Sequence, residues 1–412
     1  MTISTSSTWG LRALHHAQEL ARTGRGSATQ AEAQAAEYVR QQLIPLGISS
    51  VHVQPFIGLR SINLFIGLAF GFTLIGHAAY WLLRQPFGIL PATVLSILSF
   101  AFSGFVLWRK FTFQDYPLRT SLPHGPSQNV IAVLPPAGEV QQRVVLVAHL
   151  DSHRAVWWYA SDLLVAIYIV LSPIAIGGVV ISPVLYILAA LFQQPVLAWI
   201  GLIWVAIHFI GWFTGVTADL GPYSPGANDN ASAVGTVLAL AERIRLTSLQ
   251  HTEVWLAFTG CEETGADGMR ALLDEYGKSL KKALFLDFEV VGIGEQLVYM
   301  QNEGIARRKR IPVEIEHLIQ DAGKEFGIKP LGIAGLGALT EIGVVLERGY
   351  RGVCILARRA RSPLIPEWHR LSDTANRLEP VALEHAHDLG WEVLQIVDKL
   401  SWSGIQPSNS GV

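Results

Sequence analysis

The stretch RVVLVAHLD, residues 143 to 151, carries an apolar run directly into a histidine and an aspartate. It is rich in Val and Leu on both faces, which predicts a central strand of a sheet. An apolar block at 156–217 follows almost at once, and the polar stretch GANDN, residues 226 to 230, comes after that block. Another apolar block occupies 62–108. We therefore expect a sheet domain whose chain leaves twice to form membrane-spanning insertions.

The two apolar blocks have the lengths of helical hairpins that cross a bilayer. Four segments supply about the length needed for a 30 Å hydrocarbon core, namely 62–83, 87–108, 163–181 and 196–214. Residues 184–192 are too short to span alone, so they either extend a tilted helix or lie in the interface. Because strands flank each block, both of its ends must lie on one side of the membrane. Two crossings per block, about four transmembrane helices in total, satisfy this condition.

This organisation divides the chain into three parts. They are a discontinuous domain formed by 1–60, 110–154 and 218–412, a first hairpin at 61–109 and a second at 155–217.

Basic residues near the membrane ends indicate the orientation. Arg60, Arg109, Lys110 and Arg154 lie on the domain side of the blocks, and Arg84 lies on the opposite side. Because cytoplasmic loops carry an excess of Lys and Arg, we expect an integral membrane protein with its domain in the cytoplasm.

Two histidines, His77 and His208, fall inside the expected spans. A histidine at this depth is either a functional group or a neutral side chain that bonds to a neighbouring helix.

The composition argues against several classes of protein. Half of the residues are hydrophobic, 16% are charged, and the net charge of −2 lacks the basic excess of a nucleic-acid-binding protein. Two cysteines, Cys261 and Cys354, provide no disulfide framework. The N-terminal residues show no signal-peptide apolar region. The lipid bilayer is thus an expected partner and nucleic acid is not, while the oligomeric state stays undetermined.

Outside the apolar blocks, strand patterns alternate with helical patterns. We expect helices at 8–45, 230–245, 312–326 and 380–400, and strands at 129–134, 143–150, 253–259, 283–291 and 352–356. This alternation predicts an α/β fold in which helices sandwich a mixed, mostly parallel sheet.

Polar side chains gather where these strands end. In such sheets ligands bind just beyond the carboxyl ends of the strands. The candidate residues at these positions are His149 and Asp151, Asp229, Glu262 and Glu263, Asp287, and His369 with Asp373.

Histidines and carboxylates at one sheet edge form the mixed nitrogen and oxygen ligand set that zinc accepts. A pair such as Glu262-Glu263 suits a divided role, in which one carboxylate binds metal and the other acts as a general base. Each motif alone has an ordinary alternative: a Glu-Glu pair is common on solvated faces, and Asp-Asn is common at helix N-caps. Their joint order at strand ends favours a metal site.

At this point the sequence resembles a known family of zinc-dependent exopeptidases, metallopeptidase family twenty-eight, which includes bacterial leucyl aminopeptidases, glutamate carboxypeptidase and glutaminyl cyclase. The matching pieces occur in the family's order and are AHLDS at 148–152, GANDNAS at 226–232, FTGCEETG at 258–265, Leu286-Asp287, and His369 with Asp373-Thr374.

The resemblance implies a fold and a set of roles. The fold is an eight-stranded mixed sheet between helices. Two zinc ions are implied per chain, one held by His149 and Asp287, the other by Glu263 and His369, with Asp229 bridging them. Glu262 is then the general base, and Asp151 supports the site.

Three departures accompany this resemblance. Cys261 occupies a position where the family usually has glycine, so it either tunes the base or fills space. Glu289 lies on the same strand face as Asp287 and is the alternative ligand. The long gap between Asp151 and Asp229 implies a substrate pocket close to the bilayer. Glu341, by contrast, resembles the family's acidic position before its last strand, and it either contacts substrate or begins a helix.

These observations predict a membrane-anchored dizinc exopeptidase, an aminopeptidase that hydrolyses peptides. The alternatives are a catalytically inactive peptidase-like membrane scaffold, a single-zinc enzyme similar to glutaminyl cyclase, and a transporter. The sequence names neither the peptide nor the end at which it is recognised.

Overall fold

The computed structural model describes residues 9–48, 50–305, 307–332 and 339–400. The chain forms two compact units. Unit 1 comprises residues 1–60, 124–155 and 223–412, and unit 2 comprises residues 61–123 and 156–222. Residues 110–123 and 218–222, expected with the sheet domain, thus belong with the membrane-type helices.

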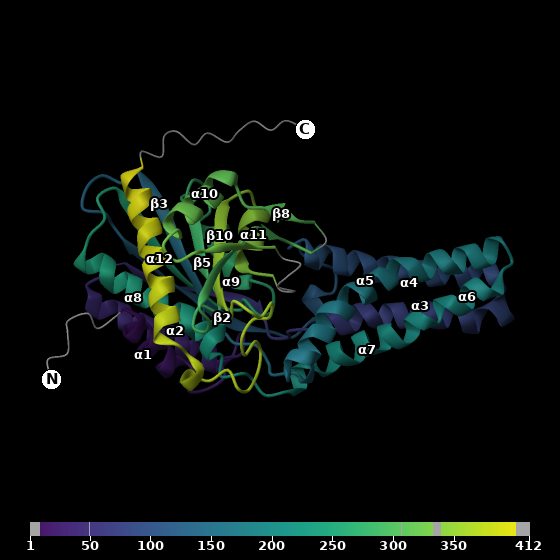
Figure 1. The fold of residues 1–412 in the computed structure, drawn as a ribbon. Helices are drawn as coiled ribbons and strands as arrows, with labels where there is room; N and C mark the ends of the chain where they lie inside the picture. Colours follow the sequence, from purple (N-terminus) through teal and green to yellow (C-terminus); the bar gives the residue numbers. More distant parts are fainter. Residues whose placement is uncertain (1–8, 49, 306, 333–338, 401–412) are drawn as a thin grey trace. The chain divides into compact units, whose positions relative to one another are not determined.

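Unit 1 is built on an eight-stranded sheet in the order β1-β2-β4-β3-β5-β10-β6-β9 (Figure 1). The strands are β1 (Val51–Leu59), β2 (His124–Leu134), β3 (Gln142–His149), β4 (Thr252–Thr259), β5 (Leu284–Phe288), β6 (Gln296–Met300), β9 (Lys329–Leu331) and β10 (Arg351–Arg358). A separate two-stranded sheet pairs β7 (Asn302–Glu303) with β8 (Lys309–Arg310).

The strands at the centre of the sheet are parallel. β3 pairs in parallel with β4 and β5, and β5 pairs in parallel with β10. The antiparallel pairs are β1 with β2, β2 with β4, and β6 with β10. Residues 144–149 of β3 are all buried, as its apolar faces predict. The mixed, mostly parallel sheet is therefore confirmed, and the carboxyl ends of β3, β4, β5 and β10 lie along one edge.

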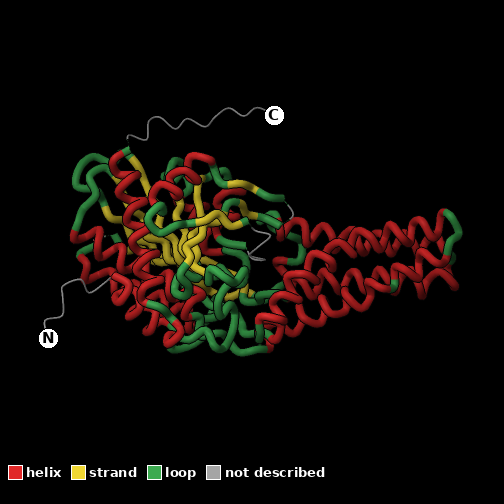
Figure 2. The backbone as a smooth tube through the Cα atoms, in the orientation of Figure 1, coloured by secondary structure: helices red, strands yellow, loops and turns green. Residues whose placement is uncertain are grey.

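Helices cover the sheet of unit 1, as Figure 2 shows. They are α1 (Trp9–Leu20), α2 (Gln30–Leu43), α8 (Ser232–Leu246), α9 (Asp267–Tyr276), α10 (Val313–Ala322), α11 (Glu341–Glu347) and α12 (Pro380–Lys399). α1, α8 and α12 pack against one another, while α9 packs against α11. The result is the expected sandwich of helices around a sheet.

One expected helix, at 8–45, is wrong in its extent. α1 ends at Leu20 and α2 begins at Gln30, with an irregular segment between them. Gly24 and Gly26 lie in this segment, and any Cβ atom on either would collide with Tyr223. Close packing of the backbone, which the 3.6-residue periodicity does not report, interrupts the helix here.

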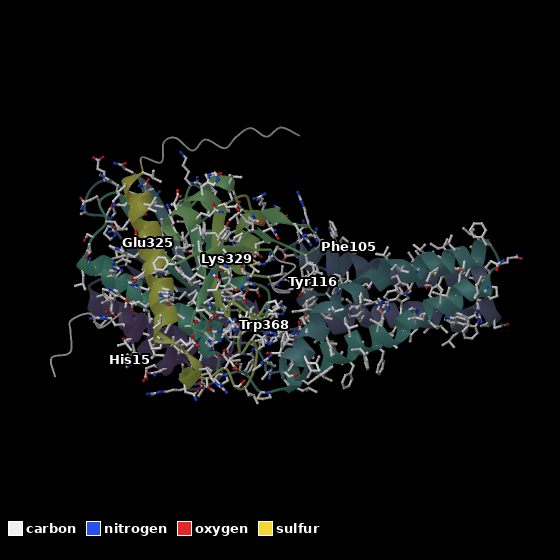
Figure 3. All side chains as sticks on the ribbon, in the orientation of Figure 1. His15, Phe105, Tyr116, Glu325, Lys329 and Trp368 are labelled. Atoms are coloured by element: carbon white, nitrogen blue, oxygen red, sulfur yellow. The ribbon has the colours of Figure 1, made fainter. Side chains whose placement is uncertain are left out.

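Unit 2 is an assembly of apolar helices. They are α3 (Leu64–Phe87), α4 (Ile89–Phe111), α5 (Asp162–Leu191), α6 (Pro195–Gly201) and α7 (Ile203–Thr217). Among the described residues, four helical segments are long and apolar enough to cross a membrane, with α6 and α7 counted in one segment. Residues 184–191 continue α5 to a length of 30 residues, so this stretch extends a helix. Large apolar side chains such as Phe105 project outward from these helices (Figure 3).

The two histidines of unit 2 take part in one chain of hydrogen bonds. His77 Nδ1 lies 2.5 Å from the hydroxyl of Tyr186, and His77 Nε2 lies 3.1 Å from His208 Nδ1. His208 Nε2 lies 3.2 Å from the carbonyl oxygen of Ala175. A carbonyl only accepts, so neutral rings satisfy every contact when Tyr186 donates to His77 and His77 donates to His208. The chain thus joins α3, α5 and α7.

Candidate metal centre

The centre of this site is Asp229, a carboxylate held between two histidines. Its Oδ1 lies 3.3 Å from His149 Nε2, and its Oδ2 lies 3.2 Å from His369 Nε2. Glu263 Oε2 lies 3.4 Å from the same atom of His369. Burial raises the pKa of Asp229, but hydrogen bonds from the two histidines lower it well below its ordinary value. The two oxygens of one carboxylate therefore face two separate nitrogen ligands.

These separations fit zinc. Ligand atoms about 2.0–2.1 Å from a tetrahedral ion lie roughly 3.3 Å from one another. His149, Asp229 and Glu263 offer ligand atoms within 4.8 Å of one another, as do His153, Glu263 and His369. Two overlapping groups that share Glu263, and a carboxylate that faces both histidines, have the form of a site for two neighbouring ions.

The paired glutamates are positioned by Asp151, which the sheet register brings to them. β3 and β4 run in parallel with His149 beside Thr259, so the loops that follow both strands meet. Asp151 Oδ1 accepts from the backbone N–H of Glu262 at 3.0 Å, and Oδ2 accepts from that of Glu263 at 3.2 Å. Burial raises the pKa of Glu262 well above its ordinary value, and the carboxylates of neighbouring acids raise it further.

Asp229 is placed by contacts from the loop after β10. Asp373 Oδ1 accepts from Asn228 N at 2.7 Å, and its Oδ2 accepts from Asp229 N at 3.1 Å. Gly226, with φ +61°, begins this turn, and a Cβ atom there would lie 2.5 Å from the carbonyl oxygen of Asp229. The GANDN motif therefore needs glycine at this position, and Asp373 acts by holding the backbone that carries Asp229.

Asp287 on β5 and Glu289 just after it are the two candidates for the metal ligand that this strand supplies. The register pairs Asp287 with Val147, two residues before His149 on β3. Continuing the register puts Glu289 beside His149 and on the same face as Asp287. Asp287 is fully buried, whereas Glu289 retains 9% exposure. Glu289 thus lies at the level of the histidine ligand, and Asp287 lies one step deeper in the sheet.

Buried carboxylate oxygens around this edge have no hydrogen-bond partner among the described residues. They are Glu263 Oε1, both oxygens of Asp287, Glu289 Oε1 and Glu341 Oε1. Burial raises the pKa of Asp287 to about 7 and that of Glu341 to about 8. Unpaired buried oxygens are costly in a folded protein, and bound cations remove that cost. The donor set therefore fits divalent metal.

The structure also shows the surroundings of Cys261 and Glu341, for each of which the sequence left two alternatives. Cys261 has φ +53°, the left-handed conformation that favours glycine, and its buried Sγ lies against Gly58 of β1. This packing favours the space-filling alternative. Glu341 begins α11 and is fully buried, and its carboxylate accepts from Thr259 Oγ1 at 2.6 Å. It thus takes the helix-start position beneath the edge of the sheet.

Sequence reasoning missed several residues of this site, two of them in the segment between α1 and α2 and one, Glu32, in the first turn of α2. Ser27 Oγ donates to Asp151 Oδ2 at 2.6 Å, and Glu32 accepts from the backbone N–H of Cys261 at 2.8 Å. Arg25 donates to the loops that carry the ligands. His153 stacks on His369, with ring centroids 3.6 Å apart. The two glycines beside Arg25 were the one available signal that the helical pattern breaks here.

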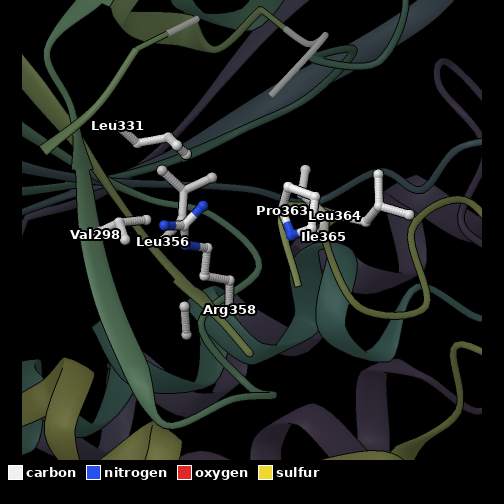
Figure 4. Close-up of a pocket in the computed structure, with 8 residues that line it drawn as sticks. Val298, Leu331, Leu356, Arg358, Pro363, Leu364 and Ile365 are labelled. Carbon is white, nitrogen blue, oxygen red and sulfur yellow. The ribbon is translucent and has the colours of Figure 1, made fainter. Parts of the chain in front are cut away.

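A small cavity lies between β6, β9 and β10. It is lined by apolar side chains with Arg358 among them (Figure 4), and its volume is about 10 Å³. A space of this size holds one water molecule and excludes an amino-acid side chain. It therefore defines no side-chain specificity.

Three comparisons relate this chain to known proteins. The family model Peptidase family M28 matches residues 211–394, which include the motifs from GANDN to His369. No curated protein sequence matches the chain.

The fold is similar to that of several solved structures. A Bacteroides thetaiotaomicron glutaminyl cyclase has a TM-score of 0.56 at 13% identity, over 94% of this chain and 97% of that one. A Zn-dependent exopeptidase from Parabacteroides distasonis has a TM-score of 0.55 at 14% identity, with the same coverage of each chain. BSAP, a zinc aminopeptidase from Bacillus subtilis, has a TM-score of 0.53 at 14% identity, over 94% of both chains. At such identities the likeness demonstrates a shared fold, as the resemblance implied.

Proposed function

We propose that this chain, whose residues 211–394 match the model of peptidase family M28, is a membrane-anchored metallopeptidase. In this proposal it is an exopeptidase with two zinc ions, and it removes residues from the amino end of peptides. The carrying observation is Asp229, whose two oxygens face His149 and His369 at 3.3 and 3.2 Å. A carboxylate in this position would be able to hold two neighbouring ions.

We assign one ion to His149 and Asp229 with an acid of the β5 segment, and the other to Asp229, Glu263 and His369. The register pairs Asp287 with Val147, and its continuation by two residues would set Glu289 beside His149, so we favour Glu289 over Asp287 as the acid. Asp287 was the expected ligand and Glu289 its alternative. Because both have unpartnered buried oxygens, a variant of each is needed to decide.

Zinc at such a site supplies Lewis acidity, which activates water and polarises the peptide carbonyl group. Glu262 would be the general base, which accepts a proton from the attacking water and returns it to the departing amine. Burial raises the pKa of Glu262, which is the direction that makes a carboxylate a stronger base. Asp151 fixes Glu262 and Glu263 through their backbone N–H groups, so the base and the ligand keep their separation.

The proposal of the amino end rests on the fold likeness to BSAP, a zinc aminopeptidase from Bacillus subtilis.

Membrane anchoring rests on unit 2. Its helices have spanning length, and outward-facing apolar side chains include Leu82, Leu90 and Leu163, each about 70% exposed. The basic residues beside the blocks support an orientation with unit 1 in the cytoplasm, which is part of the same proposal. Labelling of an introduced surface cysteine in unit 1, in intact cells and then in lysed cells, tests the orientation.

The decisive experiment replaces Glu262 by Gln. The variant is expected to bind zinc as the wild type does and to lose at least 100-fold in kcat on aminoacyl p-nitroanilides, because general-base catalysis contributes 10²–10⁴-fold. Full activity with Gln at this position would eliminate the assigned role.

A second candidate is a cyclase that acts on N-terminal glutamine. The fold likeness to the Bacteroides thetaiotaomicron glutaminyl cyclase favours it. Zinc per chain separates the two functions, as does turnover of glutaminyl peptides against leucyl peptides. Two zinc ions and leucyl hydrolysis support the exopeptidase, whereas one zinc ion and cyclisation support the alternative.

A further inference from the structure

Arg25 is a buried cation with an unusual set of partners. It is 2% exposed, and its side chain donates to backbone carbonyl oxygens of three separate segments. Nε donates to Leu150 at 2.8 Å, and Nη2 donates to Gly226 at 2.9 Å. Nη1 donates to Pro225 at 2.6 Å and to Leu20, at the end of α1, at 3.0 Å. Leu150 stands between His149 and Asp151, and Gly226 stands three residues before Asp229.

The backbone of Arg25 is joined to the same two loops through serines. Arg25 N donates to Ser152 Oγ at 2.9 Å, and Ser152 N donates to the carbonyl oxygen of Arg25 at 3.1 Å. Ser152 Oγ donates in turn to the carbonyl oxygen of Ser224 at 2.9 Å. Arg25 and its backbone thus tie residues 150–152 to residues 224–226 without any metal.

These two loops need such a tie because they are far apart along the chain. The chain leaves unit 1 after Ala155 and returns at Tyr223, with all of the second hairpin between them. No strand of the main sheet lies between β3 and α8 in the sequence, and the backbone of the described residues joins the two loops only locally, through a bridge between Arg154 and Tyr223 and a bond from Ser224 N to the carbonyl oxygen of His153 at 2.8 Å. Short contacts across the loops must therefore set the distance from His149 to Asp229.

The choice of arginine follows from its shape and charge. A guanidinium carries five N–H donors in a rigid plane and reaches several carbonyl groups at once, whereas an ammonium presents a compact point charge. Burial lowers the pKa of Arg25 to about 10, and the charges of Asp373, Asp151, Asp229 and Glu263 oppose that fall. The residue thus stays charged at neutral pH beside the acidic ligand set.

We infer that Arg25 is the positioning residue of the metal centre: it clamps the loop that carries His149 and Asp151 to the loop that leads to Asp229, and so sets the spacing of the metal ligands. This inference rests on the proposed function, because it assumes that these residues bind zinc. The role is structural and directed at one site, and it assigns Arg25 no contact with substrate.

Arg25→Lys tests the clamp in the full-length protein purified in detergent. Arg22→Lys is the matched control, since Arg22 is about 70% exposed and pairs with Glu19 on the surface of α1. Zinc affinity is measured by competition with a chelating dye, and ligand geometry by the visible absorption of the cobalt(II)-substituted protein. Arg25→Lys is expected to weaken zinc binding about 10- to 100-fold and to change the cobalt spectrum, as changes in groups that orient metal ligands do. Arg22→Lys is expected to match the wild type in both.

Wild-type zinc affinity together with a wild-type cobalt spectrum in Arg25→Lys would overturn the inference. If that variant does not fold, Ser152→Ala removes the hydroxyl that joins Arg25 to Ser224 and provides the second test. Its zinc affinity is expected to fall, and an unchanged value overturns the clamp. A wild type that binds zinc without peptide hydrolysis removes the proposed function alone, whereas a wild type that binds no zinc removes both.

Discussion

Asp151→Asn is the most informative perturbation of this site, because Asp151 organises catalytic residues while the register holds it in place. Its Oδ1 accepts from Glu262 N at 3.0 Å, and its Oδ2 accepts from Glu263 N at 3.2 Å and from Ser27 Oγ at 2.6 Å. An asparagine of the same size keeps one oxygen and places an NH₂ group where the other oxygen was.

The cost follows from these contacts. In one orientation the NH₂ group faces the N–H of Glu263, and in the other it faces the N–H of Glu262. Either orientation leaves one buried N–H without an acceptor, which costs about 1–3 kcal/mol. The remaining hydrogen bonds lose their charge assistance, which adds about 1 kcal/mol. This cost is present in the free enzyme as well as in the transition state, so it lowers the free energy of unfolding by about 2–4 kcal/mol. The backbone of Glu262 and Glu263 also loses a fixed acceptor, and because misplacement of a catalytic group costs on the order of 100-fold in rate, we expect kcat/KM to fall about 100-fold.

The assay is kcat/KM on an aminoacyl p-nitroanilide, with zinc content and the thermal unfolding midpoint measured in parallel. Asp388→Asn is the matched control, since Asp388 pairs with Arg243 away from the site and the same chemical change there should leave kcat/KM unaltered. Ser27→Ala removes one of the three hydrogen bonds and should lose less activity than Asp151→Asn. A folded Asp151→Asn protein with wild-type kcat/KM would refute the reasoning.

Three further outcomes are expected. Glu289→Gln should about halve the zinc content measured by elemental analysis while Asp287→Asn retains both ions, because Glu289 lies at the level of the histidine ligand. Asp398→Asn should lower the free energy of unfolding in urea by about 1 kcal/mol at pH 7, since its carboxylate accepts from three backbone N–H groups at 2.7–2.8 Å. Burial raises the pKa of Asp398, but these hydrogen bonds lower it by more, so the pKa in the folded protein lies below the ordinary Asp value near 3.9. The stability difference between wild type and variant is therefore fully present above about pH 3.9. It disappears as the pH falls through the lower pKa of the folded protein. Tyr186→Phe should lower the unfolding temperature in detergent, because His77 Nδ1 loses its donor at a cost of about 1 kcal/mol.

Each of these has a result that contradicts it. Loss of zinc from Asp287→Asn alone would return the ligand role to Asp287. A stability difference for Asp398→Asn that grows below pH 3 would mean that the carboxylate is not held ionised by its hydrogen bonds. An unchanged unfolding temperature in Tyr186→Phe would show that the histidine chain adds nothing to the packing of α3, α5 and α7. Leu82→Ala, at an exposed position of α3, serves as the control for Tyr186→Phe.

The local sequence pattern was enough to predict several features of the structure. Apolar length predicted four helices that are long and apolar enough to cross a membrane, and runs of apolar residues predicted the central strands, because these properties depend on residues adjacent in the sequence. The order of the polar motifs at strand ends predicted the ligand edge. The strands β6 to β9 were missed, since they are two to five residues long and carry too few positions to show a period.

Sequence by itself thus indicated which residues would carry the proposed chemistry: His149, Asp229, Glu262 and Glu263 stand in motifs whose residue types and order point to a metal site. Tertiary structure decided how they are held. The clamp that we infer for Arg25 depends on packing between two loops that are separated along the chain by apolar helices of unit 2. The choice between Asp287 and Glu289 depends on strand register, because residues two apart on one strand face the same way and only the neighbouring strand distinguishes their depth.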